Sequence, residues 1–197
     1  MTKRAACADC ERPLKTCLCD VLVSMACPYR VVILQDEKEA RHALSSAPIL
    51  EKSIVGAVRL VGEYFDPLAI LGSDWRGGTV LVFPAENAVT ADQLERKNIK
   101  NIILLDGTWR KVARLMHLNS WLAELPCVAI QATKASQYKI RKSPRQDGLS
   151  TIEAAVAALN GLVPESDYSA ILPAFYKMID LQIEAMGVET YQKNYPS

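Results

Sequence analysis

The chain has 197 residues, half of them apolar, and a formal net charge of +1. A chain of this length can bury one good core and carry a small appendage. The near-neutral charge excludes a wholly basic nucleic-acid binder. No apolar run is long enough to cross a bilayer, and the first seven residues lack the apolar core of a signal peptide. We therefore expect no membrane association and a cytoplasmic location.

Four of the six cysteines cluster near the N-terminus: Cys7, Cys10, Cys17 and Cys19. Disulfides are rare in a reducing cytoplasm, so four clustered thiols favour a tetrahedral structural zinc ion. The spacing between the last two thiols is tighter than in most zinc ribbons, and a redox pair or simple buried thiols are the alternatives. We predict a zinc knuckle in segment 1–28, followed by a domain of residues 29–197. Cys27 and Cys127 are expected in the core.

Strand and helix patterns alternate after the knuckle. The expected strands cover residues 29–34, 57–61, 79–83, 101–105 and 127–130. The expected helices begin near Glu37, at Pro48, at Thr90 (to Lys97), after Gly107, at Ser150 (ending at Gly161) and at Pro173 (ending at Gly187). This βα order predicts an α/β fold, with a mainly parallel sheet and helices on both faces.

The strand expected at 101–105 ends on a carboxylate, Asp106, followed by Gly107 and Thr108. The glycine permits a tight turn, and the threonine can cap the next helix. Ligands bind at the carboxyl ends of strands in such sheets, so Asp106 is a candidate for chemistry. The alternative interpretation makes Asp106 and Thr108 turn and capping residues and Trp109 a core anchor.

The helix after Gly107 has an apolar stripe and a basic face. The stripe expected to face the core is Trp109, Val112, Ala113 and Met116. From Trp109 to Arg145 there are eight Lys or Arg residues and one acidic residue, Glu124. Such a patch binds phosphate backbones; a solvated face is the plainer alternative. His117, on the basic face, is expected to be a surface residue rather than a catalyst.

A second helix start combines two possible roles. Ser150 and Glu153 have the spacing of a capping box, which is a structural role. Free backbone N–H groups at a helix start can also receive a carboxylate or a phosphate. The last expected helix, by contrast, indicates packing and no chemistry.

The tetrapeptide Asp106-Gly107-Thr108-Trp109 resembles the signature of the DTW-domain family, the tRNA-uridine aminocarboxypropyltransferases. Other blocks follow in the family's order: the cysteine cluster with Pro13, Ile33-Leu34-Gln35 with Glu39 and Ser45-Ser46, Leu81-Val82-Phe83-Pro84, and Tyr138-Lys139-Ile140-Arg141 with Leu149-Ser150-Thr151-Ile152-Glu153. The resemblance covers roughly residues 7–159. Three residues depart from it: Asp36-Glu37 stand where His-Pro is common, and Ser46 stands where Thr is usual.

The resemblance implies a SPOUT-like core, a class that includes knotted sheets, and S-adenosyl-L-methionine (SAM) as donor substrate. The implied reaction moves the 3-amino-3-carboxypropyl group of SAM to N3 of a uridine in tRNA and releases 5′-methylthioadenosine. The implied partner is tRNA, with zinc as a structural metal and no obligate protein partner.

The resemblance also implies roles for single residues. Asp106 is the expected base, because a uridine N–H is a poor nucleophile until it is deprotonated. The SAM contacts are expected from Phe83, Pro84, Asp106, Gly107, Thr108, Trp109, Leu149, Ser150, Thr151 and Glu153. The RNA contacts are expected from Arg110, Arg114, Tyr138, Lys139, Arg141 and Lys142. Trp109 or Tyr138 could stack on the uridine.

Two other functions fit parts of the sequence. A SPOUT-type RNA methyltransferase would use the same donor but leave S-adenosylhomocysteine. A non-catalytic, zinc-bearing RNA-binding module would not bind SAM; the intact Asp106 block argues against it.

Overall fold

The computed structural model describes residues 5–130 and 149–194, and within them five parallel strands form one sheet in the order β2-β1-β4-β3-β5. The strands are β1 (Arg30–Gln35), β2 (Val58–Val61), β3 (Thr79–Val82), β4 (Asn101–Asp106) and β5 (Cys127–Val128). β4 lies at the centre, and its residues are almost all buried. Parallel sheets are usually covered on both faces, and this one confirms the predicted α/β fold.

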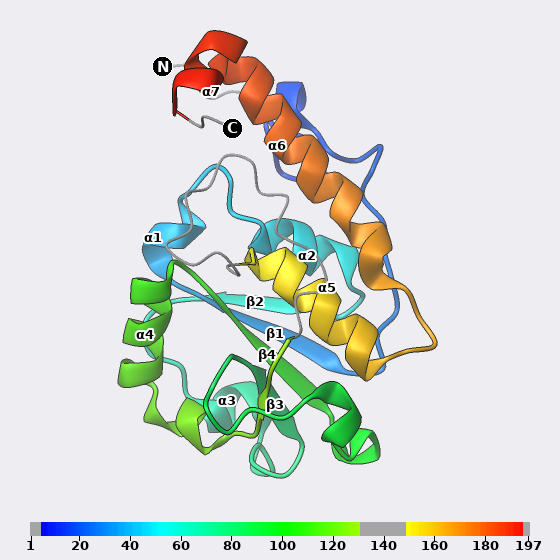
Figure 1. Cartoon of the computed structure of the whole chain (residues 1–197), viewed down its shortest axis with the longest axis vertical. Helices are drawn as coiled ribbons and strands as arrows, with labels where there is room; N and C mark the ends of the chain where they lie inside the picture. The colour runs from blue at the N-terminus through cyan, green and yellow to red at the C-terminus, as the bar shows by residue number, and fades with distance from the viewer. Residues whose placement is uncertain (1–4, 131–148, 195–197) are drawn as a thin grey trace.

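The described helices form a layer on each face of the sheet (Figure 1). They are α1 (Glu37–Ala40), α2 (Ala47–Ser53), α3 (Pro67–Leu71), α4 (Trp109–Leu118), α5 (Thr151–Leu162), α6 (Leu172–Met186) and α7 (Val188–Asn194). Short 3₁₀ turns join them: Leu14–Thr16, Ala91–Gln93, Arg96–Asn98, Ser120–Glu124 and Tyr168–Ile171. None of the helices in residues 5–130 and 149–194 is both long and apolar enough to cross a membrane.

Alternate residues of the central strands point into two separate cores. Ile33 and Leu104 pack under α2, α5 and α6. Leu34 and Ile103 pack on the opposite face, where Trp75 and Trp121 belong to the same cluster. Side-chain alternation therefore decides which layer each strand residue reaches. Gln35 and Asp106 continue the parity of Ile33 and Leu104, so they lie on the α2 and α5 face.

The described part of segment 1–28 packs against the main core. Leu18 is fully buried and belongs to the cluster under α2 and α5. The Arg12 Nη1 atom donates to Met178 Sδ on α6 at 3.3 Å, and Lys177 on α6 pairs with Asp20. These contacts fix the knuckle on one face of the α/β domain.

One predicted helix is absent from the described residues, and one predicted helix end is wrong. The stretch predicted as a helix over 90–97 contains two 3₁₀ turns instead, at Ala91–Gln93 and Arg96–Asn98. Leu94 then adopts an extended conformation and packs on the core. Gly161 does not end α5, which continues to Leu162. A Cβ at Gly161 would lie 3.0 Å from Ala91 Cβ, so this glycine lets α5 approach the 3₁₀ turn at Ala91–Gln93.

One of the four residues predicted for the apolar stripe of α4 is wrong. Val112 is buried as expected, but Ala113 is exposed and Leu115 is buried in its place. Helical spacing permits both patterns, and the packing selects the larger side chain. The remaining boundaries shift by up to two residues: β1 starts at Arg30, β5 ends at Val128, and α6 starts at Leu172.

Candidate active site

The site centres on the carboxyl end of β4. Gln35 and Asp106 are register partners in neighbouring parallel strands, and both side chains lie on the α2 and α5 face. The Asp36 N–H donates to the Asp106 carbonyl at 3.1 Å, which ties the two strand ends together. The Asp106 side chain is buried, with the residue only 4% exposed. Asp106 therefore lies at the carboxyl end of its strand, as predicted.

A buried amide contacts the Asp106 carboxylate. Gln35 Nε2 donates to Asp106 Oδ2 at 2.6 Å and to Ser45 Oγ at 2.7 Å. Arg59 Nη1 donates to Gln35 Oε1 at 2.8 Å, and Arg59 Nε donates to Glu51 Oε2 at 2.8 Å. Sequence reasoning did not place Gln35 or Arg59 in the site. One signal was available: a buried apolar run, 31–34, ends on a polar residue just as 102–105 does.

The position that departs from the family pattern has a structural role here. Asp36 is buried and caps α1, since its Oδ1 accepts from Lys38 N at 2.9 Å and from Glu39 N at 3.2 Å. Lys111 Nζ lies 2.7 Å from Glu39 Oε2 and 3.7 Å from Asp36 Oδ1. The hydrogen bond to Glu39 raises the pKa of Lys111 above its usual value. This ion-pair cluster joins α1 to α4 beside Asp106.

Gly107 allows close packing at this junction. A Cβ on Gly107 would lie 3.0 Å from Lys111 Cβ and 3.8 Å from Asp36 Cβ. Thr108 occupies the N-cap position of α4 as predicted, but its side chain makes no capping hydrogen bond. Trp109 is half-buried, a state compatible with both of its expected roles.

The other expected SAM contacts lie after β3 and before α5. Phe83 is half-buried and its N–H donates to Val128 O, while Pro84 is exposed. Ser150 and Glu153 form the predicted capping box: Ser150 N and Oγ both contact Glu153 Oε2, at 2.8 and 2.6 Å. Both residues are buried, whereas Leu149 and Thr151 are half-buried. α5 packs against β3 and β4, and its start lies toward the end of the sheet where α4 begins (Figure 1).

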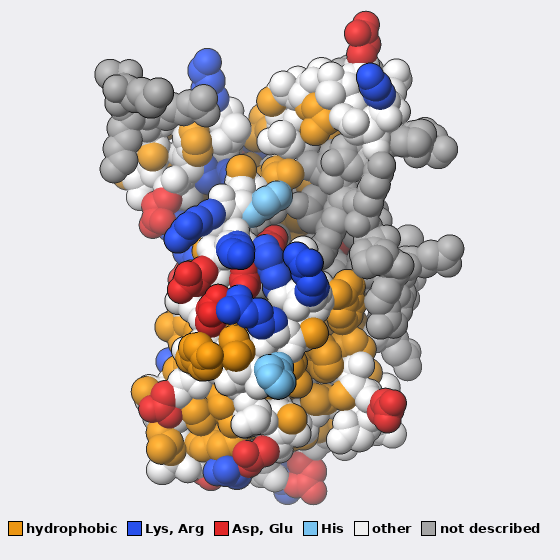
Figure 2. Space-filling view, turned by 90° about the vertical axis from the view of Figure 1, so that its left-hand side faces the viewer, with side chains coloured by type: hydrophobic (Ala, Val, Ile, Leu, Met, Phe, Trp, Pro, Cys, Tyr) orange, Lys and Arg blue, Asp and Glu red, His pale blue; other side chains and the backbone are white. Residues whose placement is uncertain are grey.

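The expected RNA contacts are only partly described. Arg110 is exposed on α4, and Arg114 makes a bidentate pair with Glu63 at 2.6 Å. Figure 2 shows that Lys and Arg side chains gather over α1 and α4, interleaved with acidic ones. Tyr138, Lys139, Arg141 and Lys142 lie outside the described residues. The charge of this face is therefore mixed over the part of the chain that the structure describes.

The four clustered thiols converge. The Sγ atoms of Cys7, Cys10, Cys17 and Cys19 all lie within 4.8 Å of one another. Cys7 and Cys19 are 3.5 Å apart, and Cys10 and Cys17 are 3.7 Å apart. Tetrahedral zinc with Zn–S bonds of about 2.3 Å separates its sulfur ligands by about 3.8 Å. The donor set and its spacing fit a structural zinc ion.

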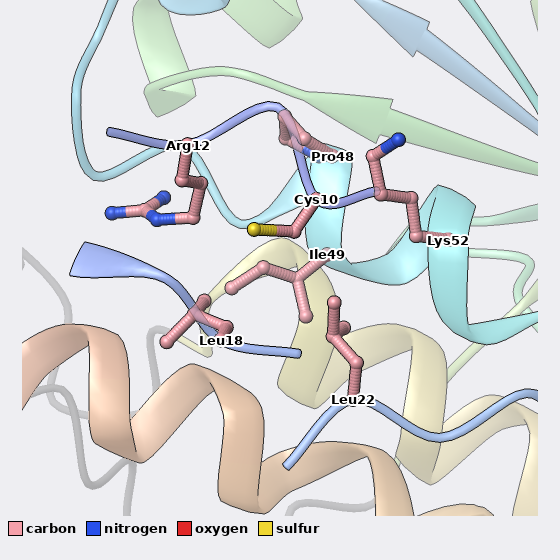
Figure 3. Close-up of a pocket in the computed structure, with 7 residues that line it drawn as sticks. All are labelled: Cys10, Arg12, Leu18, Leu22, Pro48, Ile49 and Lys52. Atoms are coloured by element: carbon pink, nitrogen blue, oxygen red, sulfur yellow. The ribbon is translucent and has the colours of Figure 1, made fainter. Parts of the chain in front are cut away.

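The surroundings of Cys10 favour its thiolate form, and the pocket beside it is small. Burial raises the pKa of Cys10, but backbone hydrogen bonds from Leu18 and Arg12 outweigh it and lower the value to about 6. A pocket of about 20 Å³ lies between the knuckle and α2, lined by Cys10, Arg12, Leu18, Leu22, Pro48, Ile49 and Lys52 (Figure 3). It has room for about one water molecule and none for a nucleoside.

Comparison with known families identifies the family of the chain. The family model described as the DTW domain matches residues 4–183, which include the thiol cluster and both strand ends of the site. The chain belongs to the DTW domain family. No solved structure matches, so a SPOUT-like, knotted core stays a prediction.

Curated relatives carry a common activity name. A Mus musculus protein named tRNA-uridine aminocarboxypropyltransferase 2 is 29% identical over 80% of this chain and 56% of its own length. The Macaca fascicularis protein of that name is 28% identical over the same shares. The Drosophila melanogaster one is 27% identical over 98% of this chain and 81% of its own length. The chain thus spans about half the length of the two mammalian relatives.

Proposed function

We propose that this DTW domain transfers the 3-amino-3-carboxypropyl group of SAM to N3 of a uridine in tRNA. The single observation that carries the proposal is Asp106: a buried carboxylate at the carboxyl end of the central strand, inside the DTW tetrapeptide. The names of the relatives supply the reaction class. The rest follows from what the reaction demands of the residues around Asp106.

Asp106 acts as the base. It accepts the N3 proton of uridine as N3 forms a bond to the γ carbon of the donor. The bond between that carbon and the sulfonium sulfur breaks, and its electron pair stays on sulfur, so neutral 5′-methylthioadenosine leaves. The proton then passes from Asp106 to water. SAM supplies an electrophilic carbon activated by the sulfonium charge; the protein's part is to present that carbon, not the methyl, in line with N3.

We expect the SAM contacts to come from three segments: the residues after β3, the start of α4 and the start of α5. Phe83 and Pro84, which follow β3, offer an apolar surface for the adenine ring. The turn of Gly107, Thr108 and Trp109 contacts the donor, and Gly107 lets this turn pack closely because a Cβ there would lie 3.0 Å from Lys111 Cβ. At the start of α5, the N–H groups of Ser150 and Glu153 serve the capping box, so we expect the donor's carboxylate to be received by those of Leu149 and Thr151. The capping box orders this helix start before the donor binds.

The RNA contacts extend along α4. Arg110 is exposed, and Arg114 is paired with Glu63, a carboxylate that it would exchange for a phosphate when RNA binds. Tyr138, Lys139, Arg141 and Lys142 complete the proposed surface. Replacing Arg141 and Lys142 together by Ala should weaken tRNA binding and flatten its salt dependence, because fewer counterions are released. Unaltered tRNA affinity would contradict the role of these two residues.

The thiol cluster holds a structural zinc ion in this proposal. Because all four thiols are ligands, no position stays open for substrate. Free thiols of this density also favour a reducing compartment such as the cytoplasm.

The donor product tests the reaction class. Incubation of the protein with SAM and tRNA should release 5′-methylthioadenosine in amounts equal to the modified uridine. Release of S-adenosylhomocysteine instead would make the protein a methyltransferase. The absence of both products and of SAM binding would leave a non-catalytic RNA-binding module.

A further inference from the structure

A chain of hydrogen bonds connects Asp106 to an ion pair on the far side of β1. It runs from Asp106 to the Gln35 amide, on to Arg59 in β2, and ends at Glu51 in α2, with donor–acceptor distances of 2.6, 2.8 and 2.8 Å. We propose that Arg59, held by Glu51, is a positioning residue that fixes the Gln35 amide and through it the Asp106 carboxylate. The inference rests on the proposed role of Asp106 as base.

The contacts of Gln35 determine which end of its amide faces the carboxylate. Its nitrogen donates both hydrogens, one to Asp106 and one to Ser45, while its oxygen accepts from Arg59. Turning the amide over would place its oxygen against the carboxylate and its nitrogen against the guanidinium. Both new contacts would be repulsive, so Arg59 and Asp106 impose the same orientation from opposite ends.

Burial makes this arrangement rigid. Gln35 is fully buried, and Ser45 and Asp106 are each less than a tenth exposed. The Arg59 and Glu51 side chains are more accessible, at 22% and 29%, but two hydrogen bonds join them: Arg59 N also donates to Glu51 Oε1. Arg59 can therefore be replaced without opening the buried part of the site.

The perturbation is Arg59→Met, which keeps the length of the stem and removes the guanidinium. The matched control is Arg76→Met, because Arg76 also pairs with a glutamate, Glu124, at 2.8 Å but lies away from Asp106 and before β3. We expect Arg59→Met to lower the single-turnover rate at saturating substrates on the order of 10-fold, the size of effect that loss of alignment produces. Affinity for SAM and for tRNA should change by less than about twofold. Arg59→Lys, which keeps the charge and can reach one of its two partners, should recover part of the rate.

The pH profile separates positioning from general loss of structure. The Gln35 donor stabilises the charged form of the carboxylate, so weakening it should move the acid limb of the rate profile to higher pH. Besides Arg59 and its partner Glu51, the charged groups near this strand end among the described residues include Asp36, Glu39, Lys111 and Glu153, and both Arg59 variants keep all of these but Arg59 itself. A loss of folded protein would lower the whole profile without moving it.

A readout independent of activity is the side-chain amide signal of Gln35 in a ¹⁵N spectrum. Its hydrogens should exchange slowly in the wild type and in Arg76→Met, and faster in Arg59→Met. If Arg59→Met leaves the rate, the pH profile and the exchange unchanged, the positioning role is wrong. If the wild type transfers nothing, the proposed function fails, and the exchange measurement still decides whether Arg59 holds the amide.

Discussion

Replacing Asp106 by Asn separates catalysis from architecture at the centre of the site. The Gln35 nitrogen lies 2.6 Å from Asp106 Oδ2, so the new amide must present its oxygen there to avoid two facing donors. It can do this by rotation, and the hydrogen bond survives without the charge. Loss of charge assistance at one buried bond costs about 1 kcal/mol of folding stability. The variant should therefore fold and keep its affinity for SAM and tRNA.

The expected rate loss is much larger than that stability change. An asparagine cannot take the uridine proton, and loss of a general base lowers rates by about 100-fold or more, equivalent to about 2.7 kcal/mol in the barrier. The assay is single-turnover transfer at saturating SAM and tRNA, with urea unfolding measured in parallel. The control is Asp66→Asn at the N-cap of α3, where Asn caps as well as Asp does. Transfer by Asp106→Asn at near the wild-type rate, with both substrates bound, would leave Asp106 a structural residue.

Three other predictions concern the metal, the basic face and the core. The protein should contain about one zinc per chain by elemental analysis; Cys17→Ser should release it and Cys27→Ser should not, and a fully reduced wild type without metal would contradict the knuckle. Arg110→Ala should lower the slope of tRNA affinity against salt by about one unit, whereas Arg76→Ala should not; equal slopes would make Arg110 a solvated residue. Burial raises the pKa of Tyr168 to about 12, and because its neutral form is favoured in the folded state, its contribution to stability is complete below about pH 10 and is lost toward pH 12. In urea unfolding, the folding stability lost between about pH 10 and 12 should be smaller in Tyr168→Phe than in the wild type. An equal loss in the two proteins would contradict the contribution of Tyr168.

The parts of the site that are local in sequence could be predicted. The four thiols lie on one short segment, so their spacing alone indicated that they converge, and they do. Asp106 directly follows its strand, and that position places it at the carboxyl edge of the sheet. The capping box of Ser150 and Glu153 likewise depends on residues three apart.

The parts that depend on strand order could not be predicted. Gln35 contacts Asp106 only because β1 and β4 are neighbours in the sheet. In the chain, β2 and β3 lie between these two strands. Arg59 joins them because β2 lies on the other side of β1. A single sequence reveals which residues end strands but not which strand ends lie side by side.

Packing between distant elements explains the wrong boundaries. Glycine commonly ends helices, but Gly161 instead allows α5 to pack closely against Ala91. No local sequence pattern reveals that contact. Ala113 is four residues after Trp109 and Leu115 is three after Val112, so both fit helical spacing with a predicted stripe residue, and in the folded chain it is Leu115 that is buried.

The most direct test of the account is mass spectrometry of tRNA nucleosides after incubation with the purified protein and SAM. We expect a uridine carrying a 3-amino-3-carboxypropyl group on N3, formed by the wild type and nearly absent with Asp106→Asn. A methylated nucleoside, or unmodified tRNA under conditions where SAM and tRNA both bind, would contradict it.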